Sequence, residues 1–294
     1  MFFVLDGSGF LFRAYYSLPK ILDKNWNEAG AIFGFFRMLL KLLHQKPDNF
    51  IVVFDPGTKT VREKEFKEYK QNRPEIDEGF KQQIPKIIDI LKRSGFDVEI
   101  IPDYEADDVI SSLVNTIKDK DKVVVVSSDK DLKQLIQPNV EFLEPKKMEY
   151  VDENKFKEEY WFEPEGMLLY LSLLGDNSDN IPGVKGIGKV TASSIVSKYP
   201  TYDALIQNLD KLSPKIRQSI QNSKDLIEKN ISLVKLRNPG NFDFEKIKES
   251  SSIKKINFDK LKDILVNEYG FKSFDSLIDK AKKEILTPTQ LGLF

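Results

Sequence analysis

The sequence contains no cysteine and a single histidine, and these two scarcities exclude several kinds of chemistry. Without cysteine there is no disulfide, thiolate zinc site, iron–sulfur cluster or cysteine nucleophile. The one histidine, His44, lies in an apolar helical pattern and excludes a multi-histidine metal site. No uncharged stretch approaches the roughly 20 residues of a membrane span, and the N-terminus lacks the basic region of a signal peptide. Catalysis must therefore use carboxylates, lysine, arginine, tyrosine or metals held by oxygen. We expect a cytoplasmic protein without a membrane segment.

The composition is that of a soluble globular protein, with 40% apolar and 31% charged residues among 294. The net charge of −1 hides an asymmetry along the chain. Residues 1–179 contain 25 Lys+Arg and 33 Asp+Glu, whereas residues 180–294 contain 20 and 13. Random scatter is one explanation. The alternative that we favour is a carboxylate-rich half joined to a half that binds a polyanion.

Short apolar runs alternate with helical patterns, which predicts an α/β architecture with a parallel sheet. The predicted strands are FFVL (2–5), FIVVF (50–54) and VVVV (123–126). The predicted helices between them are 31–45, 82–95 and 107–119, the second ending at Gly95. From Trp161 onward the chain reads as helices, with a final helix at about 274–286. The polar segment 57–81 is either a helical insertion or a long surface loop.

Acidic residues follow each of the three predicted strands. Asp6 follows the first, Asp55 the second, and Asp129 and Asp131 follow the third. Because the carboxyl ends of parallel strands meet at the edge where ligands bind, we expect these side chains to converge. Asp is also a common turn residue, and acids in a first helical turn can be ordinary caps, so each acid alone has a structural alternative. Further acids come from a helix start and from a turn: Glu105, Asp107 and Asp108, and Asp176 and Asp179.

Clustered carboxylates repel one another, so a positive group must neutralise them. Since the chain has one histidine and no cysteine, hard divalent cations, Mg²⁺ or Mn²⁺, suit these ligands. The number of acids exceeds what one Mg²⁺ needs. Two ions are the usual arrangement for phosphodiester hydrolysis, because they generate hydroxide and stabilise the charge on the scissile phosphate. The sequence therefore predicts two Mg²⁺ (or Mn²⁺).

The charged insertion contains cations and aromatic residues at helical spacing: Arg62, Phe66, Tyr69, Lys70 and Arg73. If the segment is helical, these five residues share one face. Such a face suits single-stranded nucleic acid, because the cations pair with phosphates and the rings stack on bases. The alternative is a solvated helix of mixed charge.

A glycine-rich turn, GVKGIG, precedes the helical pattern KVTASSIV. Gly183, Gly186 and Gly188 allow close approach of the backbone to a phosphate, and Lys185 and Lys189 add positive charge. The pattern at about 181–197 resembles a helix-hairpin-helix, which grips the duplex backbone without reading sequence. A Rossmann loop has different glycine spacing and follows a strand, which is missing here.

Together these motifs resemble a known family. The chain is similar to the 5′–3′ exonuclease domain of bacterial DNA polymerase I, within the flap-endonuclease family, over about residues 1–280. Six motifs stand in the family's order: VLDGSGFLFRAYY, VVFDPG, EYKQNRP, YEADDVI, VVSSDKDLKQL and LLGDNSDNIPGVKGIGKVTA. The resemblance implies a mainly parallel, PIN-like sheet with helices on both faces. It implies an acidic nuclease domain at 1–160 with a helical arch at about 57–84, and a helical DNA-binding region at 161–286.

The resemblance also implies roles for the site residues. The first metal site would contain Asp6, Asp55, Glu105, Asp107 and Asp108. The second would contain Asp129, Asp131, Asp176 and Asp179. Lys70 and Arg73 would be arch cations that contact the scissile phosphate, and Tyr69 would stack on a base.

The polymerase domains that accompany this module in DNA polymerase I are missing, so the chain is either a free-standing paralogue or a truncated form. The terminal QLGLF favours the first, because residues 287–294 resemble a peptide that binds the bacterial sliding clamp. Its contact residues would be Gln290, Leu291, Leu293 and Phe294. The alternative is a hydrophobic tail that packs on its own domain.

We interpret the sequence as a monomeric, structure-selective 5′ nuclease of replication and repair. Its expected substrates are DNA with 5′ flaps, nicks or overhangs, with RNA–DNA hybrids as a second class. A PIN-type ribonuclease shares the acidic sheet edge, but it needs neither the glycine-rich turn nor a basic second half. A non-catalytic junction-binding protein is disfavoured, because carboxylates repel DNA unless metals neutralise them.

Overall fold

A six-stranded sheet forms the centre of the structure, a computed structural model that describes residues 1–18, 20–73 and 76–286. The strand order is β3-β2-β1-β4-β5-β6. The first five strands are parallel to their neighbours, and β6 runs antiparallel to β5. The strands are β1 (Phe2–Asp6), β2 (Asn49–Val53), β3 (Asp97–Glu99), β4 (Val123–Val126), β5 (Val140–Glu144) and β6 (Glu149–Val151).

Helices cover both faces of the sheet, which explains why the central strands are apolar throughout. Along β1, Phe2 and Val4 belong to one buried cluster, and Phe3 and Leu5 belong to another on the opposite face. Helix α6 (Ala106–Ile117) and the helices between residues 153 and 250 cover the first face. The second face is covered by α1 (Gly7–Ser17), α2 (Gly30–Leu43) and α5 (Gln83–Arg93).

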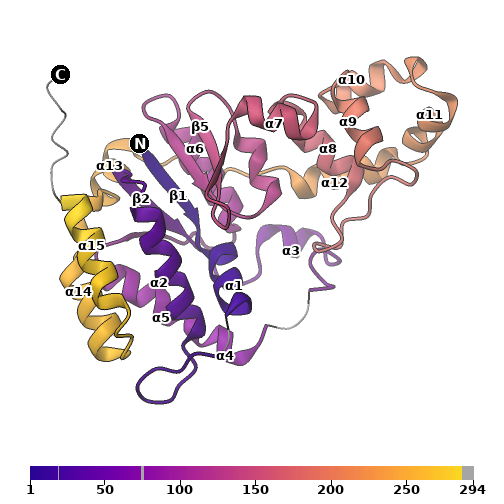
Figure 1. The fold of residues 1–294 in the computed structure, drawn as a ribbon. Helices are drawn as coiled ribbons and strands as arrows, with labels where there is room; N and C mark the ends of the chain where they lie inside the picture. The colour runs from indigo at the N-terminus through magenta and orange to yellow at the C-terminus, as the bar shows by residue number, and fades with distance from the viewer. Residues whose placement is uncertain (19, 74–75, 287–294) are drawn as a thin grey trace, which may run out of the picture.

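The second half of the chain is helical and extends away from the sheet before it returns (Figure 1). Its first part contains α7 (Glu153–Tyr160), α8 (Met167–Leu174), α9 (Lys189–Val196), α10 (Tyr202–Gln207), α11 (Pro214–Gln221) and α12 (Lys224–Val234). Its last part contains α13 (Phe244–Ser250), α14 (Phe258–Lys262) and α15 (Phe274–Leu286). Within the described residues, no helix is long and apolar enough to span a bilayer.

The last helices belong to the core of the sheet domain. Side chains of α14 and α15, including Leu261, Phe274 and Ile278, are buried in the same cluster as Phe3 and Leu5. The sequence interpretation grouped these helices with the DNA-binding region at 161–286. Their apolar faces instead complete the cover of the sheet next to α2 and α5 (Figure 1).

The three predicted strands and the main predicted helices are confirmed, with boundaries that shift by one or two residues. Sequence patterns missed β3, β5 and β6. β3 and β6 have only three residues each, and β5 carries two glutamates, so none of the three gives a continuous apolar run.

The charged insertion is not one continuous helix. Its described residues form two short helices, α3 (Val61–Glu65) and α4 (Glu78–Lys81), and turns at residues 66–73. Phe66 has an extended conformation, and Lys70 has a positive φ of 57°. The expected helical face from residue 62 to residue 73 is therefore absent. Tertiary contacts with the turn at residues 176–181 hold this segment instead.

Candidate active site

Three acidic residues lie at the carboxyl ends of neighbouring strands. Asp6 is the last residue of β1, and Asp55 and Asp129 follow β2 and β4. Since β1 pairs with β2 on one side and β4 on the other, the three strand ends meet at one edge, as the sequence predicts. Asp6 is buried and accepts a hydrogen bond from the hydroxyl of Ser127 at 2.7 Å.

The N-terminus of α6 brings another acid to this edge. The backbone N–H of Ala106 donates to Oδ1 of Asp55 at 2.9 Å, which joins α6 to the end of β2. Asp107 lies in the first turn of α6. Burial raises the pKa of Asp107 well above its ordinary value, and the charges of Asp129, Asp6 and Asp55 raise it further.

The pKa values of Asp6, Asp129 and Asp131 are also raised, mainly by burial. Burial is the main cause for Asp6, whose pKa is raised to about 6 although hydrogen bonds from Gly9 and Ser127 oppose the rise. Burial and the neighbouring Asp129 raise the pKa of Asp131 to about 8. The Oδ1 atom of Asp131 is buried and has no hydrogen-bond partner among the described residues. Ionised carboxylates are costly here unless a cation accompanies them.

Besides Asp108, whose pair with Arg62 is described below, three of the predicted metal ligands pair with cations of the chain itself. The pairs are Lys70–Glu105 at 2.7 Å, Lys130–Asp176 at 2.8 Å and Arg73–Asp179 at 2.6 Å. In the part of the chain that the structure describes, no three acids form a ready-made metal-binding group. The donors are nevertheless hard oxygens, and the buried Oδ1 of Asp131 has no hydrogen-bond partner among the described residues. These residues therefore fit a divalent-cation centre if the lysine and arginine side chains move aside.

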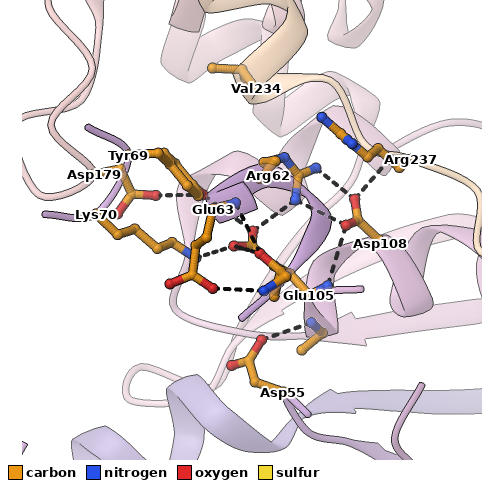
Figure 2. Close-up of polar contacts among 12 residues, drawn as sticks. Asp55, Arg62, Glu63, Tyr69, Lys70, Glu105, Asp108, Asp179, Val234 and Arg237 are labelled. Atoms are coloured by element: carbon orange, nitrogen blue, oxygen red, sulfur yellow. Dashed lines mark hydrogen bonds and ion pairs between the residues drawn. The ribbon is translucent and has the colours of Figure 1, made fainter. Parts of the chain in front are cut away.

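Lys70 of the charged insertion takes part in one of these pairs. Burial lowers the pKa of Lys70, but the charge of Glu105 opposes this effect and the net pKa is raised. The Lys70 ammonium also lies 4.9 Å from the centre of the Tyr69 ring. The Lys70 side chain is therefore charged and directed at the acidic edge (Figure 2).

Arg62 and Asp108 form a buried ion pair, which differs from the sequence interpretation. Arg62 is 3% exposed and donates to both carboxylate oxygens of Asp108, at 2.9 and 2.6 Å, and to Glu105 at 2.7 Å (Figure 2). Asp108 also accepts from the backbone N–H of Arg237 at 2.8 Å. The sequence interpretation assigned Arg62 to DNA and Asp108 to a metal. A buried guanidinium needs carboxylate partners, and these contacts use the oxygens of Asp108 for that purpose.

Two aromatic residues of the insertion, Phe66 and Tyr69, also lie inward. Tyr69 is 8% exposed, and its hydroxyl is 3.2 Å from oxygens of Glu105 and Asp179. Phe66 is partly buried against the core. In this arrangement Tyr69 orders the acids and presents no free ring face for a base, so stacking requires the segment to move.

The glycine-rich turn and the start of α9 form as the sequence predicts. Lys185 and Lys189 are exposed, and Gly188 is the N-terminal cap of α9. Neither lysine has an ion-pair partner among the described residues. Two cations beside free backbone N–H groups at a helix start form a surface that suits a phosphate backbone.

At two of these positions the structure requires glycine for reasons that the sequence did not show. A Cβ atom on Gly183 would lie 2.0 Å from the backbone oxygen of Leu174, so only glycine lets the turn pack against α8. Gly186 has a φ of 85°, which side chains rarely allow.

The structure adds residues that sequence reasoning missed. Lys130 stands between Asp129 and Asp131 and pairs with Asp176, and the sequence spacing alone could have singled it out. Ser8 accepts a hydrogen bond from the backbone N–H of Asp55 at 2.9 Å. The predicted clamp-binding residues lie outside the described residues: Gln290, Leu291, Leu293 and Phe294.

Comparisons with known proteins agree with this arrangement. Residues 1–161 match the family profile of the 5′–3′ exonuclease N-terminal, resolvase-like domain. Residues 162–258 match the profile of the 5′–3′ exonuclease C-terminal SAM fold. A 5′–3′ exonuclease of Aquifex aeolicus is 37% identical, and the alignment covers 95% of each chain. DNA polymerase I of Caldicellulosiruptor bescii is 35% identical over 92% of this chain but only 32% of its own length.

Solved structures show the same fold. The T5 D15 protein, crystallised with metal ions, superimposes with a TM-score of 0.69 at 20% identity, over 97% of this chain and 99% of that one. A product complex of the T5 D15 flap endonuclease with DNA and metal ions gives a TM-score of 0.67 at 20% identity, with the same coverage. The matched profiles, the relatives and the acidic sheet edge lead to one conclusion: the chain belongs to the 5′–3′ exonuclease family of nucleases.

Proposed function

We propose that this chain is a metal-dependent, structure-selective 5′ nuclease that hydrolyses phosphodiesters where single-stranded and double-stranded DNA meet, leaving 5′-phosphates. One observation carries the proposal. Asp6, Asp55, Asp107 and Asp129 lie at one sheet edge, and Lys70 approaches the same edge from the insertion. Such an edge repels a phosphodiester until cations neutralise it, and it then has the positive charge that phosphodiester hydrolysis requires.

Two Mg²⁺ (or Mn²⁺) ions are the cofactors that we propose. The first would be held by Asp6, Asp55, Asp107 and Glu105. The second would be held by Asp129, Asp131, Asp176 and Asp179. When bound, such ions supply hydroxide and stabilise the negative charge on the phosphate. The presence of metal ions in the T5 D15 structures supports this assignment.

The chain's own residues would position the DNA. Lys185, Lys189 and the N–H groups at the start of α9 would hold the duplex backbone. Lys70 and Arg73 would leave their acidic partners and contact the phosphate to be cut. The DNA complex of the T5 flap endonuclease supports DNA as the substrate, and RNA–DNA hybrids are a second class that we propose. We expect a monomer that acts in the cytoplasm, in replication and repair.

The direct test of this function is cleavage of a labelled 5′-flap DNA. The chain should release the flap in Mg²⁺ and not in EDTA, and it should leave matched single strands and blunt duplexes largely intact. Mg²⁺-independent cleavage, or equal cleavage of all these substrates, would contradict the proposal.

The duplex contact gives a prediction about salt. Changing Lys185 and Lys189 together to Ala should reduce the slope of log K against log salt by about 2, since each phosphate contact contributes about 0.9. Binding should weaken equally for all duplex sequences, because backbone contacts carry no sequence information. Titrations between low and moderate salt measure the slope. The control is Lys254→Ala/Lys283→Ala, which removes two exposed lysines from the far helices. An unchanged slope in the Lys185/Lys189 variant would mean that the turn does not contact DNA.

The C-terminal residues give a prediction about a partner. We propose that residues 290–294 bind a bacterial sliding clamp, since two leucines and a phenylalanine can each contribute about 1.5–3 kcal/mol on burial. After the ordering cost of the peptide, a micromolar affinity is expected. Deleting 290–294 should abolish clamp binding in a titration and leave cleavage of a free flap unchanged. Loss of thermal stability together with activity would show that the tail packs on its own domain.

A further inference from the structure

The arch segment, residues 66–73, is anchored to the acidic turn, residues 176–181, by hydrogen bonds on both sides of Lys70. The side-chain amide of Asn180 donates to the backbone oxygen of Glu68 at 2.7 Å. The same amide accepts a hydrogen bond from Nδ2 of Asn72 at 2.7 Å. Between these contacts, the backbone N–H of Lys70 donates to the backbone oxygen of Asp179 at 3.0 Å.

The acidic turn is held by its own backbone hydrogen bonds, so it can anchor the arch segment. Two backbone hydrogen bonds between Asp176 and Ile181, at 2.8 and 2.7 Å, close the turn. Asn180 has a φ of 57°, a conformation that asparagine tolerates better than most residues. The turn leads directly into the glycine-rich turn and α9. The Asn180 amide therefore joins the arch segment to the turn that carries Asp176 and Asp179. The same turn precedes the proposed duplex contact.

We propose that Asn180 is a positioning residue for the arch cations. Its amide holds the arch segment at Glu68 and Asn72, which fixes where Lys70 and Arg73 can reach over the acidic edge. Asn180 itself contacts neither phosphate nor metal in this role. The inference rests on the proposed roles of Lys70 and Arg73, and it goes beyond them by naming the group that sets their position.

The test compares variants by single-turnover cleavage of a 5′ flap at saturating enzyme. Asn180→Gly removes both hydrogen bonds and adopts positive φ without strain. It should lower the rate roughly tenfold, the scale expected for losing two hydrogen bonds. Asn72→Ala should lower the rate less, because it removes only one of the two hydrogen bonds. The double variant should be no slower than Asn180→Gly alone, because Asn180→Gly already removes the hydrogen bond that Asn72 makes. The matched control is Asn177→Ala, an exposed asparagine of the same turn whose side chain makes no hydrogen bond among the described residues.

A second comparison separates positioning from general damage to the fold. In a Lys70→Ala/Arg73→Ala background, Asn180→Gly should change the single-turnover rate by less than about twofold, since the groups that it positions are gone. If Asn180 were only structural, Asn180→Gly would lower the single-turnover rate by the same factor in both backgrounds. That outcome would overturn the proposal.

A readout without catalysis uses the lack of native cysteine. A fluorophore on Lys67→Cys, an exposed site in the arch segment, labels one position only. Asn180→Gly should lower the fluorescence anisotropy of this probe, whereas Asn177→Ala should not. Unchanged anisotropy in Asn180→Gly would overturn the proposal. Absence of Mg²⁺-dependent cleavage in the unmodified chain would instead contradict the proposed function, and the anisotropy does not depend on it.

Discussion

Replacing Asp107 with asparagine is expected to reduce Mg²⁺-dependent flap cleavage by about 10³-fold, while raising the melting temperature of the protein in EDTA. The loss of cleavage follows from removing a charged group at the centre of the acidic edge, and about 10³-fold is the upper end for losing one group that stabilises transition-state charge. The gain in stability follows because burial and three neighbouring acids make the ionised form of Asp107 unfavourable.

The stability gain should depend on pH in a definite direction. The pKa of Asp107 is raised on folding, so the folded state binds more protons than the unfolded state over the range between the two pKa values. The free energy of unfolding of the unmodified chain therefore falls as pH rises through that range. Asparagine cannot ionise, so the advantage of Asp107→Asn should be larger at pH 8 than at pH 5.

Thermal unfolding in EDTA at both pH values and cleavage in Mg²⁺ measure the two effects. The matched control is Asp119→Asn, an exposed acid just after α6 with no partner among the described residues, which should change neither quantity. Cleavage by Asp107→Asn within tenfold of the unmodified chain would remove Asp107 from the metal site.

Replacing Lys70 with alanine is expected to lower the single-turnover cleavage rate by roughly 10²-fold, the scale for losing one positioned electrostatic group. In the structure this lysine pairs with Glu105 at 2.7 Å, so its ammonium already lies beside the acidic edge. If Glu105 were to hold a metal ion, the Lys70 ammonium would be free to contact the phosphate. DNA binding should change much less than cleavage.

Single-turnover rates at saturating enzyme, with binding measured in Ca²⁺, separate the two quantities. Lys70→Arg should recover part of the rate, because it keeps the charge but changes the geometry. Lys67→Ala serves as the control, since Lys67 is an exposed lysine of the same segment. If binding weakens while the single-turnover rate stays unchanged, Lys70 only attracts DNA to the surface.

The sequence by itself determined three neighbouring strands of the sheet, β2, β1 and β4, and the location of the acidic edge. FFVL, FIVVF and VVVV are short, continuous apolar runs, and such runs fit only strands that are buried on both faces. Parallel strands place their carboxyl ends at one edge. The sequence alone therefore predicted that Asp6, Asp55 and Asp129 lie close together.

Only the tertiary structure decided the partners of the charged residues in the insertion. Spacing alone placed Arg62, Tyr69 and Lys70 on one helical face, but the helix ends at Glu65. Arg62 is instead buried against Asp108, and Tyr69 lies between Glu105 and Asp179. Sequence spacing reports the period of a local element, whereas the partner of a buried charge depends on which distant segment supplies the opposite charge. Those segments meet only when α6 and the turn at residues 176–181 pack beside the insertion.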